Sequence, residues 1–253
     1  MSVLVVRNLT KAFGGVKAIE HMSFEEAQTT EHAVIGTNGA GKTTLINLIT
    51  GIYTPDSGSV ELFGADVRGV APDRLARLGL SRTFQNLQVC MNMSALDNVM
   101  IGAHLSLGSG LLAGMLALPS TRRADARVRE RALELMDFVG VASAASLHAS
   151  QLSYGVLKRL EIARALAAQP KLLLLDEPAA GLNHTETSEV ERLIRRVAEA
   201  GTTVVLVEHD MKLVMGVSDR ILVLDHGKRL ADGPVADVRA NPDVIAAYLG
   251  APA

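Results

Sequence analysis

The chain has 253 residues, and 48% of them are hydrophobic, so it is long enough for one large domain or two small ones with a sizeable core. Its 25 basic and 27 acidic residues give a net charge of -2, which excludes the strongly basic surface typical of proteins whose main partner is nucleic acid. The single cysteine, Cys90, excludes an internal disulfide and fits a reducing compartment, and its thiol is best interpreted as a small apolar filler. The first residues lack a basic stretch followed by a long apolar one, so we expect no signal peptide.

The first quarter of the chain has the spacing of apolar residues that is typical of β-strands. Short apolar or alternating runs cover residues 4–6, 16–24, 33–35 and 59–63. Between the last two runs, the spacing predicts a helix over 44–52. The residues expected to face inward from this helix are Leu45, Ile46, Leu48 and Ile49.

A glycine-rich run connects the strand at 33–35 to this helix. It reads Gly36-Thr37-Asn38-Gly39-Ala40-Gly41-Lys42-Thr43 and matches G-x-x-x-x-G-K-[ST] in full. In such a loop the backbone N–H groups approach phosphate oxygens, the lysine reaches the β- and γ-phosphates, and the threonine hydroxyl binds Mg²⁺. The helix that follows directs the positive end of its dipole at the phosphates. The sequence therefore predicts a nucleotide site, in which the chemistry of the loop does not require the side chain of Thr37.

The middle of the chain, residues 93–152, differs from the flanking parts in its pattern of apolar residues and is predicted to be a helical insertion. A helix over 122–139 would bury Val128, Leu135, Met136 and Val139 and leave mostly outside the arginines Arg122, Arg123, Arg127, Arg129 and Arg131. We interpret these arginines as a solvated face, with a patch for anionic lipid or a partner as the alternative. The apolar stretch at 105–118 contains three glycines and is shorter than the roughly 20 residues that span a bilayer. Any membrane contact is therefore expected through another subunit.

Alternating helices and strands return after Ser153. We expect a helix to residue 168, a buried strand at 171–175, an amphipathic helix, a strand at 203–207 and a hairpin around 225–227. The inward face of the amphipathic helix consists of Val190, Leu193, Ile194 and Val197. This alternation predicts an α/β fold with a mostly parallel sheet covered on both faces.

Two carboxylates, Asp176 and Glu177, follow the buried strand at 171–175. Asp176 suits a role at Mg²⁺, either directly or through water, and Glu177 could polarise a water in line with the γ-phosphate. Taken alone, the pair could also be an acidic loop without a function. Beside a complete phosphate loop, it predicts phosphoryl transfer assisted by Mg²⁺.

These motifs occur in the order found in the ATP-binding cassette (ABC) ATPases, which the sequence resembles over nearly its whole length. Leu152-Ser153-Tyr154-Gly155 and residues 158–166 are similar to the signature motif and its helix, with Ser153 as the N-cap. The resemblance implies a P-loop NTPase (RecA-like) core with an N-terminal antiparallel β subdomain and a helical insertion subdomain. It also implies that two cassettes pair head to tail, so that Ser153 and Gly155 of each contact ATP held by the other.

The resemblance also implies roles for single residues. Phe13 is similar to the aromatic that stacks on adenine, with Val16 beside it, and residues 181–183 are similar to the loop that communicates across the dimer. The implied catalytic residues are Glu177, the switch histidine His209, Gln85 and Lys42. The implied metal ligands are Thr43, Gln85 and Asp176. The implied nucleotide-binding set is Phe13, Val16, Gly36, Thr37, Asn38, Gly39, Ala40, Gly41, Lys42, Thr43 and Thr44, with Ser153 and Gly155 acting in trans.

The sequence departs from the pattern of the family at three positions. Val156 and Leu157 stand where relatives mostly carry glutamines, and Thr37 stands where proline is usual. The changes leave Ser153 and Gly155 intact. We therefore expect them to affect the rate of turnover rather than the reaction.

Within the family, residues 82–86, 152–155, 179–183 and 223–250 are similar to the ATPases of branched-chain amino-acid importers. The resemblance implies an ATPase subunit that uses ATP and Mg²⁺, lies peripherally at the cytoplasmic face of the membrane, and works with a second cassette and two permease subunits. It divides the chain into an α/β core at about 1–92 and 157–235, a helical subdomain at 93–156 and a helical tail at 236–253. No nucleic-acid partner is expected.

Other functions share part of this pattern. Importers of urea or short amides and an exporter branch have several of the same features, so the transported molecule stays open, as does whether the two cassettes are identical. A soluble ATP-driven clamp on nucleic acid is disfavoured, because such relatives carry paired cassettes or long coiled coils and the mildly acidic composition offers no phosphate-binding field. A nucleotide-binding regulator without hydrolysis is suggested only by Val156 and Leu157.

Overall fold

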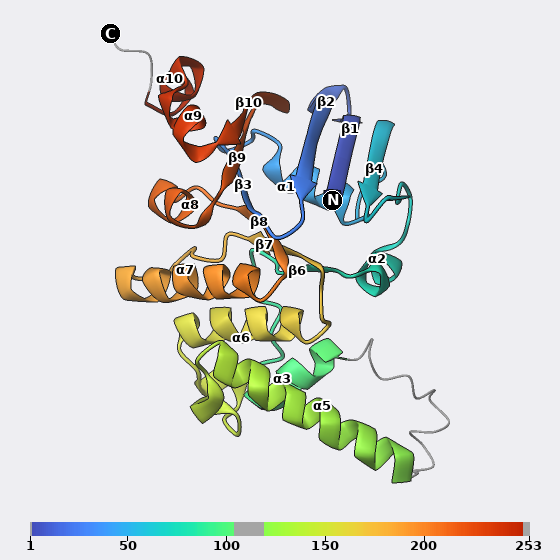
Figure 1. The fold of residues 1–253 in the computed structure, drawn as a ribbon, viewed down its shortest axis with the longest axis vertical. Coiled ribbons are helices and arrows are strands. Elements are labelled where there is room, and N and C mark those ends of the chain that lie inside the picture. The colour runs from blue at the N-terminus through green and yellow to red at the C-terminus, as the bar shows by residue number, and fades with distance from the viewer. Residues whose placement is uncertain (1, 104–118, 250–253) are drawn as a thin grey trace.

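The computed structural model describes residues 2–103 and 119–249, and Figure 1 shows their arrangement. Two β-sheets lie in the upper part of this view, and a group of helices lies below them. The apolar stretch predicted at 105–118 lies outside the described residues. Within the described part of the chain, no helix combines the length and the apolar character needed to cross a membrane.

The smaller sheet is formed by the N-terminal region and is antiparallel throughout. Its strand order is β2-β1-β4-β5, with β1 at Ser2–Phe13, β2 at Val16–Ala27, β4 at Ser57–Leu62 and β5 at Ala65–Asp66. Gly14 and Gly15 join β1 to β2, and both have positive φ (52° and 88°), as a two-residue type I′ hairpin requires. This sheet confirms the predicted antiparallel β subdomain.

The larger sheet has the strand order β10-β9-β3-β8-β7-β6 and is parallel except at the β9–β10 hairpin. Its strands are β3 (Glu31–Gly36), β6 (Leu80–Arg82), β7 (Leu172–Asp176), β8 (Thr203–Val207), β9 (Arg220–Asp225) and β10 (Lys228–Pro234). Val34 of β3 and Asp176 of β7 both pair with Val207 of β8, so the carboxyl ends of these strands meet at one edge. The predicted mostly parallel sheet is confirmed.

Helices cover both faces of the larger sheet. Alternate residues of its strands point to opposite sides, so each strand contributes to two cores. Leu173 and Leu175 of β7 join the core formed with α3, α5, α6, α7 and α8, whereas Leu172 and Leu174 join the core around α1 and the smaller sheet. The helices are α1 (Lys42–Ile49), α2 (Pro72–Leu78), α3 (Ala95–Gly102), α5 (Pro119–Phe138), α6 (Tyr154–Leu166), α7 (His184–Glu199), α8 (Met211–Val217), α9 (Val235–Ala240) and α10 (Pro242–Leu249), with short 3₁₀ turns at Ala142–Ala144 and Ala149–Gln151.

The helix predicted at 44–52 spans Lys42–Ile49, so both predicted ends were wrong. It begins earlier because the phosphate loop leads directly into its first turn, where the Leu45 N–H donates to the Gly41 carbonyl at 2.9 Å. It ends earlier because Gly51 has φ +71° and lies against the segment around Val70. A Cβ added to Gly51 would be 2.3 Å from the Val70 carbonyl oxygen. The inward residues of this helix are those that the sequence predicted, namely Leu45, Ile46, Leu48 and Ile49.

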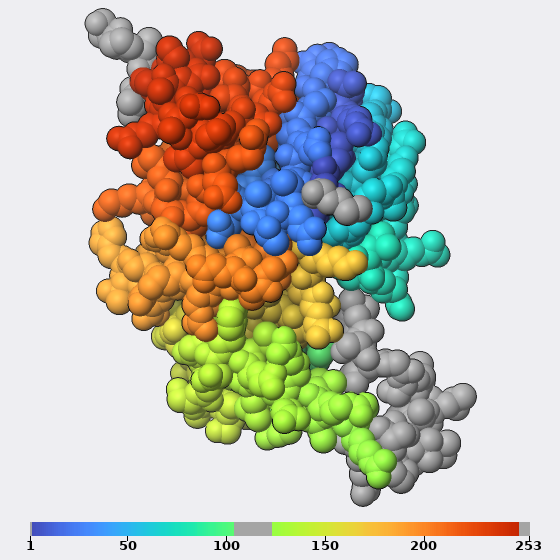
Figure 2. Space-filling model, viewed as in Figure 1, coloured from blue at the N-terminus to red at the C-terminus, as the bar shows by residue number. Residues whose placement is uncertain are grey.

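The helical insertion forms the lower lobe in Figure 2, coloured green below the orange and blue core. Its long helix, α5, buries Leu135 and Met136, half-buries Val128, and leaves exposed the arginines Arg123, Arg127, Arg129 and Arg131. Helix α6 packs against α3 and α5 and also against β6. The boundary predicted at residues 156/157 therefore falls inside a helix that contacts both the lobe and the core.

Candidate functional site

The phosphate loop lies between β3 and α1, and two of its glycines, Gly36 and Gly41, are required by close backbone contacts. A Cβ on Gly36 would lie 2.6 Å from the Leu224 carbonyl oxygen, and one on Gly41, which has φ +102°, would lie 2.5 Å from the Ala18 carbonyl oxygen. The turn of the β9–β10 hairpin supports the loop, because the Gly227 N–H donates to the Ala40 carbonyl at 2.9 Å. The predicted loop is thus held in shape by β2 and β9–β10 before any nucleotide binds.

Lys42 folds back over this loop. Its Nζ donates to the Gly36 carbonyl at 2.6 Å and to the Thr37 carbonyl at 3.1 Å. Burial lowers the pKa of Lys42 below its usual value, and the nearby carboxylates of Glu177 and Asp176 oppose that shift. The ammonium group is therefore partly desolvated, and a phosphate anion would interact with it strongly. The Thr37 side chain is exposed, and its backbone carbonyl is the group that contacts Lys42.

The carboxylates predicted after β7 stand at the same edge of the sheet. Glu177 has φ +49°, an uncommon conformation for a residue with a side chain, and its Oε2 accepts a hydrogen bond from Gln85 Nε2 at 2.9 Å. Its Oε1 lies 3.9 Å from His209 Nδ1 at the end of β8. The structure thus brings together Glu177, Gln85 and His209, three residues separated by 92 and 32 positions along the sequence.

Asp176 is buried and paired with a cation of its own chain. Its Oδ2 accepts a hydrogen bond from Arg82 Nη2 at 2.8 Å, and its backbone N–H donates to Thr83 Oγ1 at 3.2 Å. The sequence analysis quoted Arg82 within a motif but gave it no role, because a single arginine before a polar loop carries no spacing signal.

The predicted metal ligands supply only oxygen donors, as Mg²⁺ prefers. They are the Thr43 hydroxyl, the Gln85 amide oxygen and the Asp176 carboxylate, whose Oδ1 lies outside the bond to Arg82. Gln85 uses its Nε2 on Glu177, so its oxygen is the end that remains for a cation. The residues present therefore fit a magnesium ion bound together with nucleotide phosphates.

Two further residues that the sequence analysis missed hold the loops that carry Glu177 and His209. Glu208 is 1% exposed and accepts hydrogen bonds from the backbone N–H of Ala179 at 2.9 Å, His209 at 3.0 Å and Asp210 at 3.4 Å. Lys158 of α6, also buried, donates from Nζ to the Glu177 carbonyl at 3.2 Å. Glu208 joins the loop after Glu177 to the loop of His209. The only available sequence signal was a charged residue directly after an apolar strand or within an apolar helix.

The residues expected to contact adenine are exposed beside the phosphate loop. Phe13 is 44% exposed and Val16 is 70% exposed, on either side of the β1–β2 turn. Val16 precedes Ala18 by two residues, and the Ala18 carbonyl lies against Gly41. The Phe13 ring meets Tyr53 edge to face, with ring centroids 5.2 Å apart. Tyr53 is a further aromatic at this surface that the sequence analysis did not identify, because it stands alone after α1 without a motif.

The signature residues start α6 and lie against α7 and the 181–183 loop. Ser153 is the N-cap residue as predicted, but its side chain makes no capping hydrogen bond. Gly155 must lack a Cβ, which would lie 2.3 Å from Glu186 Oε1 of α7. Tyr154 is 44% exposed and lies against Gly181 of the 181–183 loop. Leu157 is buried and Val156 packs against the same core, so these two departures from the family pattern serve packing.

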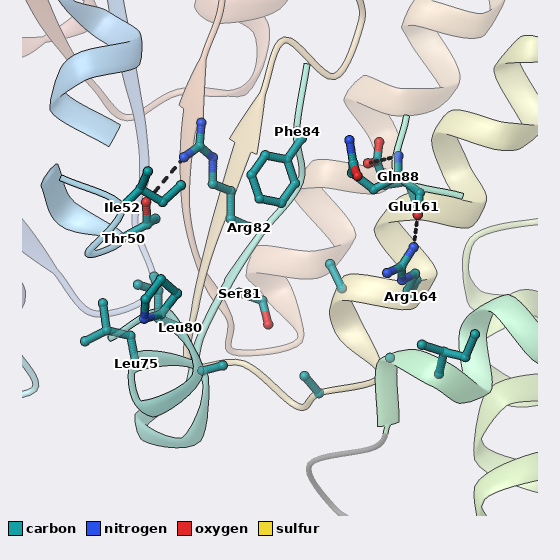
Figure 3. A pocket seen from close by; sticks show the side chains of 16 residues that line it. Thr50, Ile52, Leu75, Leu80, Ser81, Arg82, Phe84, Gln88, Glu161 and Arg164 are labelled. Atoms are coloured by element: carbon teal, nitrogen blue, oxygen red, sulfur yellow. Dashed lines mark hydrogen bonds between the residues drawn. The ribbon is translucent and has the colours of Figure 1, made fainter. Parts of the chain in front are cut away.

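A groove of about 270 Å³ runs along the boundary between the core and the helical lobe (Figure 3). Its lining is mostly apolar and comes from the segment just after α1, α2, β6, the Phe84–Gln88 loop, α3 and α6. Three charged residues line it, Arg82 of β6 and both Glu161 and Arg164 of α6, and burial raises the pKa of Glu161. Gln85 follows the strand that lines this groove, so the groove and the nucleotide site share the segment 82–85.

A phosphate loop, a sheet-edge carboxylate pair and a helical insertion with its own helix N-terminus define a nucleotide-binding ATPase cassette. The family described as ABC transporter matches residues 19–180, and the family described as branched-chain amino acid ATP-binding cassette transporter matches residues 228–253. The chain therefore belongs to the ABC transporter family and is an ATPase of that family.

Individual relatives match the chain along its length. It is 43% identical to the high-affinity branched-chain amino acid transport ATP-binding protein LivG of Salmonella typhimurium, covering 98% of both chains. It is similar to a crystal structure of a nucleotide-free ATP-binding cassette from an ABC transporter, with a TM-score of 0.86, 30% identity and coverage of 99% and 100%. It is also similar to a cassette crystallised in its ADP conformation, with a TM-score of 0.85, 29% identity and the same coverage.

Proposed function

We propose that this chain is the ATP-hydrolysing subunit of an importer of branched-chain amino acids. The observation that carries the proposal is the convergence of Lys42, Gln85, Glu177 and His209 beside a preformed phosphate loop, as given above. The match of residues 228–253 to a branched-chain amino acid cassette family and the name of the LivG relative support the substrate class.

The proposed chemistry is phosphoryl transfer from ATP to water. Lys42 exchanges its bonds to the Gly36 and Thr37 carbonyls for the β- and γ-phosphates, and the N–H groups of the phosphate loop hold the same oxygens. Glu177 orients the attacking water and accepts its proton, while Gln85 fixes the carboxylate of Glu177. His209 donates to the transferring phosphoryl group. Bound through Thr43, Gln85 and Asp176, Mg²⁺ would neutralise charge that develops on the phosphate oxygens.

A second cassette completes each site in this proposal. Ser153 leaves the start of α6 without a side-chain cap, so both its hydroxyl and the helix N-terminus can receive an anion. The phosphate loop of the same chain leads into α1, beside the sheets, whereas the start of α6 lies against α7 and the 181–183 loop. The anion we assign to Ser153 and Gly155 is therefore the γ-phosphate held by the partner cassette.

We assign the groove between the core and the lobe to the permease. It is apolar and lined from both parts of the chain, as a site for a partner helix is expected to be. Two permease subunits, one for each cassette, would place the ATPase peripherally at the cytoplasmic face of the membrane. The segment 82–85 would then connect the permease to Glu177.

Transport by the reconstituted complex tests the proposed function. The chain is co-expressed with candidate permease subunits and the substrate-binding protein, and the complex is placed in proteoliposomes. We expect uptake of leucine, isoleucine or valine that depends on ATP and is lost with Glu177→Gln. Uptake of urea or acetamide instead would assign the related importers, and ATP hydrolysis that is stimulated by DNA or RNA rather than by the permease would contradict the proposal.

A further inference from the structure

Arg82 stands at the end of β6, buried between the groove and the nucleotide site. Its side chain is 7% exposed and that of Asp176 is 8% exposed, and the two are joined at 2.8 Å. The other terminal nitrogen, Nη1, donates to Asn47 Oδ1 at 2.6 Å and to Thr50 Oγ1 at 3.3 Å. One guanidinium group therefore joins the end of α1, the helix that begins in the phosphate loop, to Asp176, the last residue of β7.

Packing alone does not require an ion pair at this position. A buried ion pair gives little net stability compared with well-packed apolar side chains of similar volume. Moreover, within the described part of the chain, Arg82 Nε is buried without a hydrogen-bond partner, which is itself destabilising. An arginine kept at this position at such a cost points to a role beyond stability.

The opposite side of Arg82 belongs to the groove. Arg82 and Thr50 both line it, and the Phe84 ring, which is 38% exposed, covers the guanidinium carbon at 4.8 Å (Figure 3). A helix bound in the groove would contact Phe84 before it reached Arg82. The same short segment continues to Gln85, which holds Glu177. Residues 82–85 therefore hold both carboxylates at the end of β7, Asp176 through Arg82 and Glu177 through Gln85.

We propose that Arg82 is a positioning residue, which fixes the Asp176 carboxylate for Mg²⁺. The inference rests on the proposed function, because it needs MgATP in this site. The role requires arginine, since the planar guanidinium reaches Asp176 and the end of α1 with two separate nitrogens, whereas lysine offers one compact charge. Arg82→Lys keeps the charge and removes this double contact.

Cation binding tests the proposal without relying on activity. Mn²⁺ is titrated into the full-length protein with a non-hydrolysable ATP analogue, followed by its electron paramagnetic resonance. We expect Arg82→Lys to weaken Mn²⁺ binding about tenfold, as loss of groups that orient metal ligands commonly does, with affinity for the analogue in EDTA changed less than about twofold. Arg68→Lys is the matched control, because Arg68 pairs with Asp66 at the surface. Unchanged Mn²⁺ affinity in a folded Arg82→Lys protein would overturn the inference.

Asn47→Ala provides a second test if Arg82→Lys does not fold. It removes the shorter of the two bonds between Arg82 and the end of α1 and leaves the one to Thr50, and we expect Mn²⁺ binding to weaken about threefold. Wild-type Mn²⁺ affinity in Asn47→Ala would count against the double contact. A wild-type protein that binds neither nucleotide nor Mn²⁺ would instead refute the proposed function itself.

Discussion

The chain presents two helix N-termini as anion sites, and they differ in how much of each site the chain supplies. The start of α1 is complete: glycines fit against neighbouring backbone, Gly227 bonds to the loop, and Lys42 already covers it. The start of α6 is open: the side chain of Ser153 makes no cap and Tyr154 is exposed. One site is built within the chain, and for the other we propose an anion that a second cassette brings. The difference predicts that a single cassette binds ATP but needs a partner to enclose it.

Lys42→Ala should have the largest effect on this comparison, because it damages the complete site. We expect affinity for ATP to fall at least about 100-fold, since a charge-assisted contact to the phosphates is lost from a partly desolvated position. Titration with a fluorescent ATP analogue measures it. Lys171→Ala, a substitution at a lysine whose Nζ lies over the Phe63 ring, is the control. Unchanged ATP affinity in Lys42→Ala would refute the assignment of the loop.

Ser153→Ala addresses the open site. We expect the variant to bind ATP normally as a monomer. We expect ATPase turnover of the dimer to fall about tenfold, because the lost hydroxyl contacts the ATP that the partner holds. Mixed dimers decide the point. A Ser153→Ala subunit paired with a Lys42→Ala subunit should keep one active site, because both changes fall in the same shared site, whereas a wild-type subunit paired with the double variant Ser153→Ala/Lys42→Ala should lose hydrolysis. If Ser153→Ala instead impaired only the ATP bound by its own subunit, the two sites would not be shared.

Glu208→Gln sharpens the description of the complete site. The buried carboxylate holds the loops of Glu177 and His209 together through backbone N–H groups, and an amide can replace only part of those contacts. We expect kcat to fall about fivefold to tenfold with the KM for ATP unchanged, because the variant affects orientation and not binding. Steady-state kinetics well below the unfolding temperature measure it. A rise in KM at constant kcat would contradict this role.

Glu31→Gln should have the smallest effect and lies far from both helix starts. Burial and the nearby Asp219 and Glu199 raise the pKa of Glu31 from 4.5 to about 7, although Arg195 lowers it. Because the folded state holds this proton more tightly, the stability it provides is present below about pH 4.5 and is lost as the pH rises to about 7. Glu31→Gln should therefore raise Tm at about pH 8 and not at about pH 4.5. The expected rise is only about 2 °C, because Glu31 is half-buried and solvent screens its charge.

The exposed Glu130→Gln is the control for this prediction, since it makes the same chemical change on the solvent face of α5. Melting curves at both pH values measure the effect. An equal rise in Tm for Glu31→Gln at pH 4.5 and pH 8 would show that the change does not come from the ionisation of Glu31.

The fold could largely be predicted from the sequence because its signals are local. The phosphate loop between a strand and a helix, the buried strand before Asp176 and Glu177, and the two-residue turn at His226 and Gly227 each depend on neighbouring residues. The ends of α1 were wrong because tertiary contacts decide them: Gly41 leads into the helix, and Gly51 turns the chain against Val70.

The supports of the site could not be predicted, because they join distant parts of the sequence. The contacts of Arg82 with Asp176, Lys158 with Glu177 and Glu208 with Ala179 span 94, 19 and 29 positions. A charged residue that satisfies a buried partner has the same sequence appearance as one on the surface. Only the fold distinguishes them, since it determines which side chains are removed from water.

The central claim, that two copies or two sister cassettes enclose ATP between them, is tested most directly by the association state of Glu177→Gln. This variant should bind ATP and hydrolyse it at least about 100-fold more slowly, because the water loses its base. Sedimentation velocity is measured with ATP, Mg²⁺ and a sister cassette where one exists. We expect a dimer that reverts to monomers when ATP is removed. The double variant Glu177→Gln/Ser153→Ala should not form this dimer. ATP-saturated Glu177→Gln that stays monomeric, alone and in the permease complex, would contradict the account.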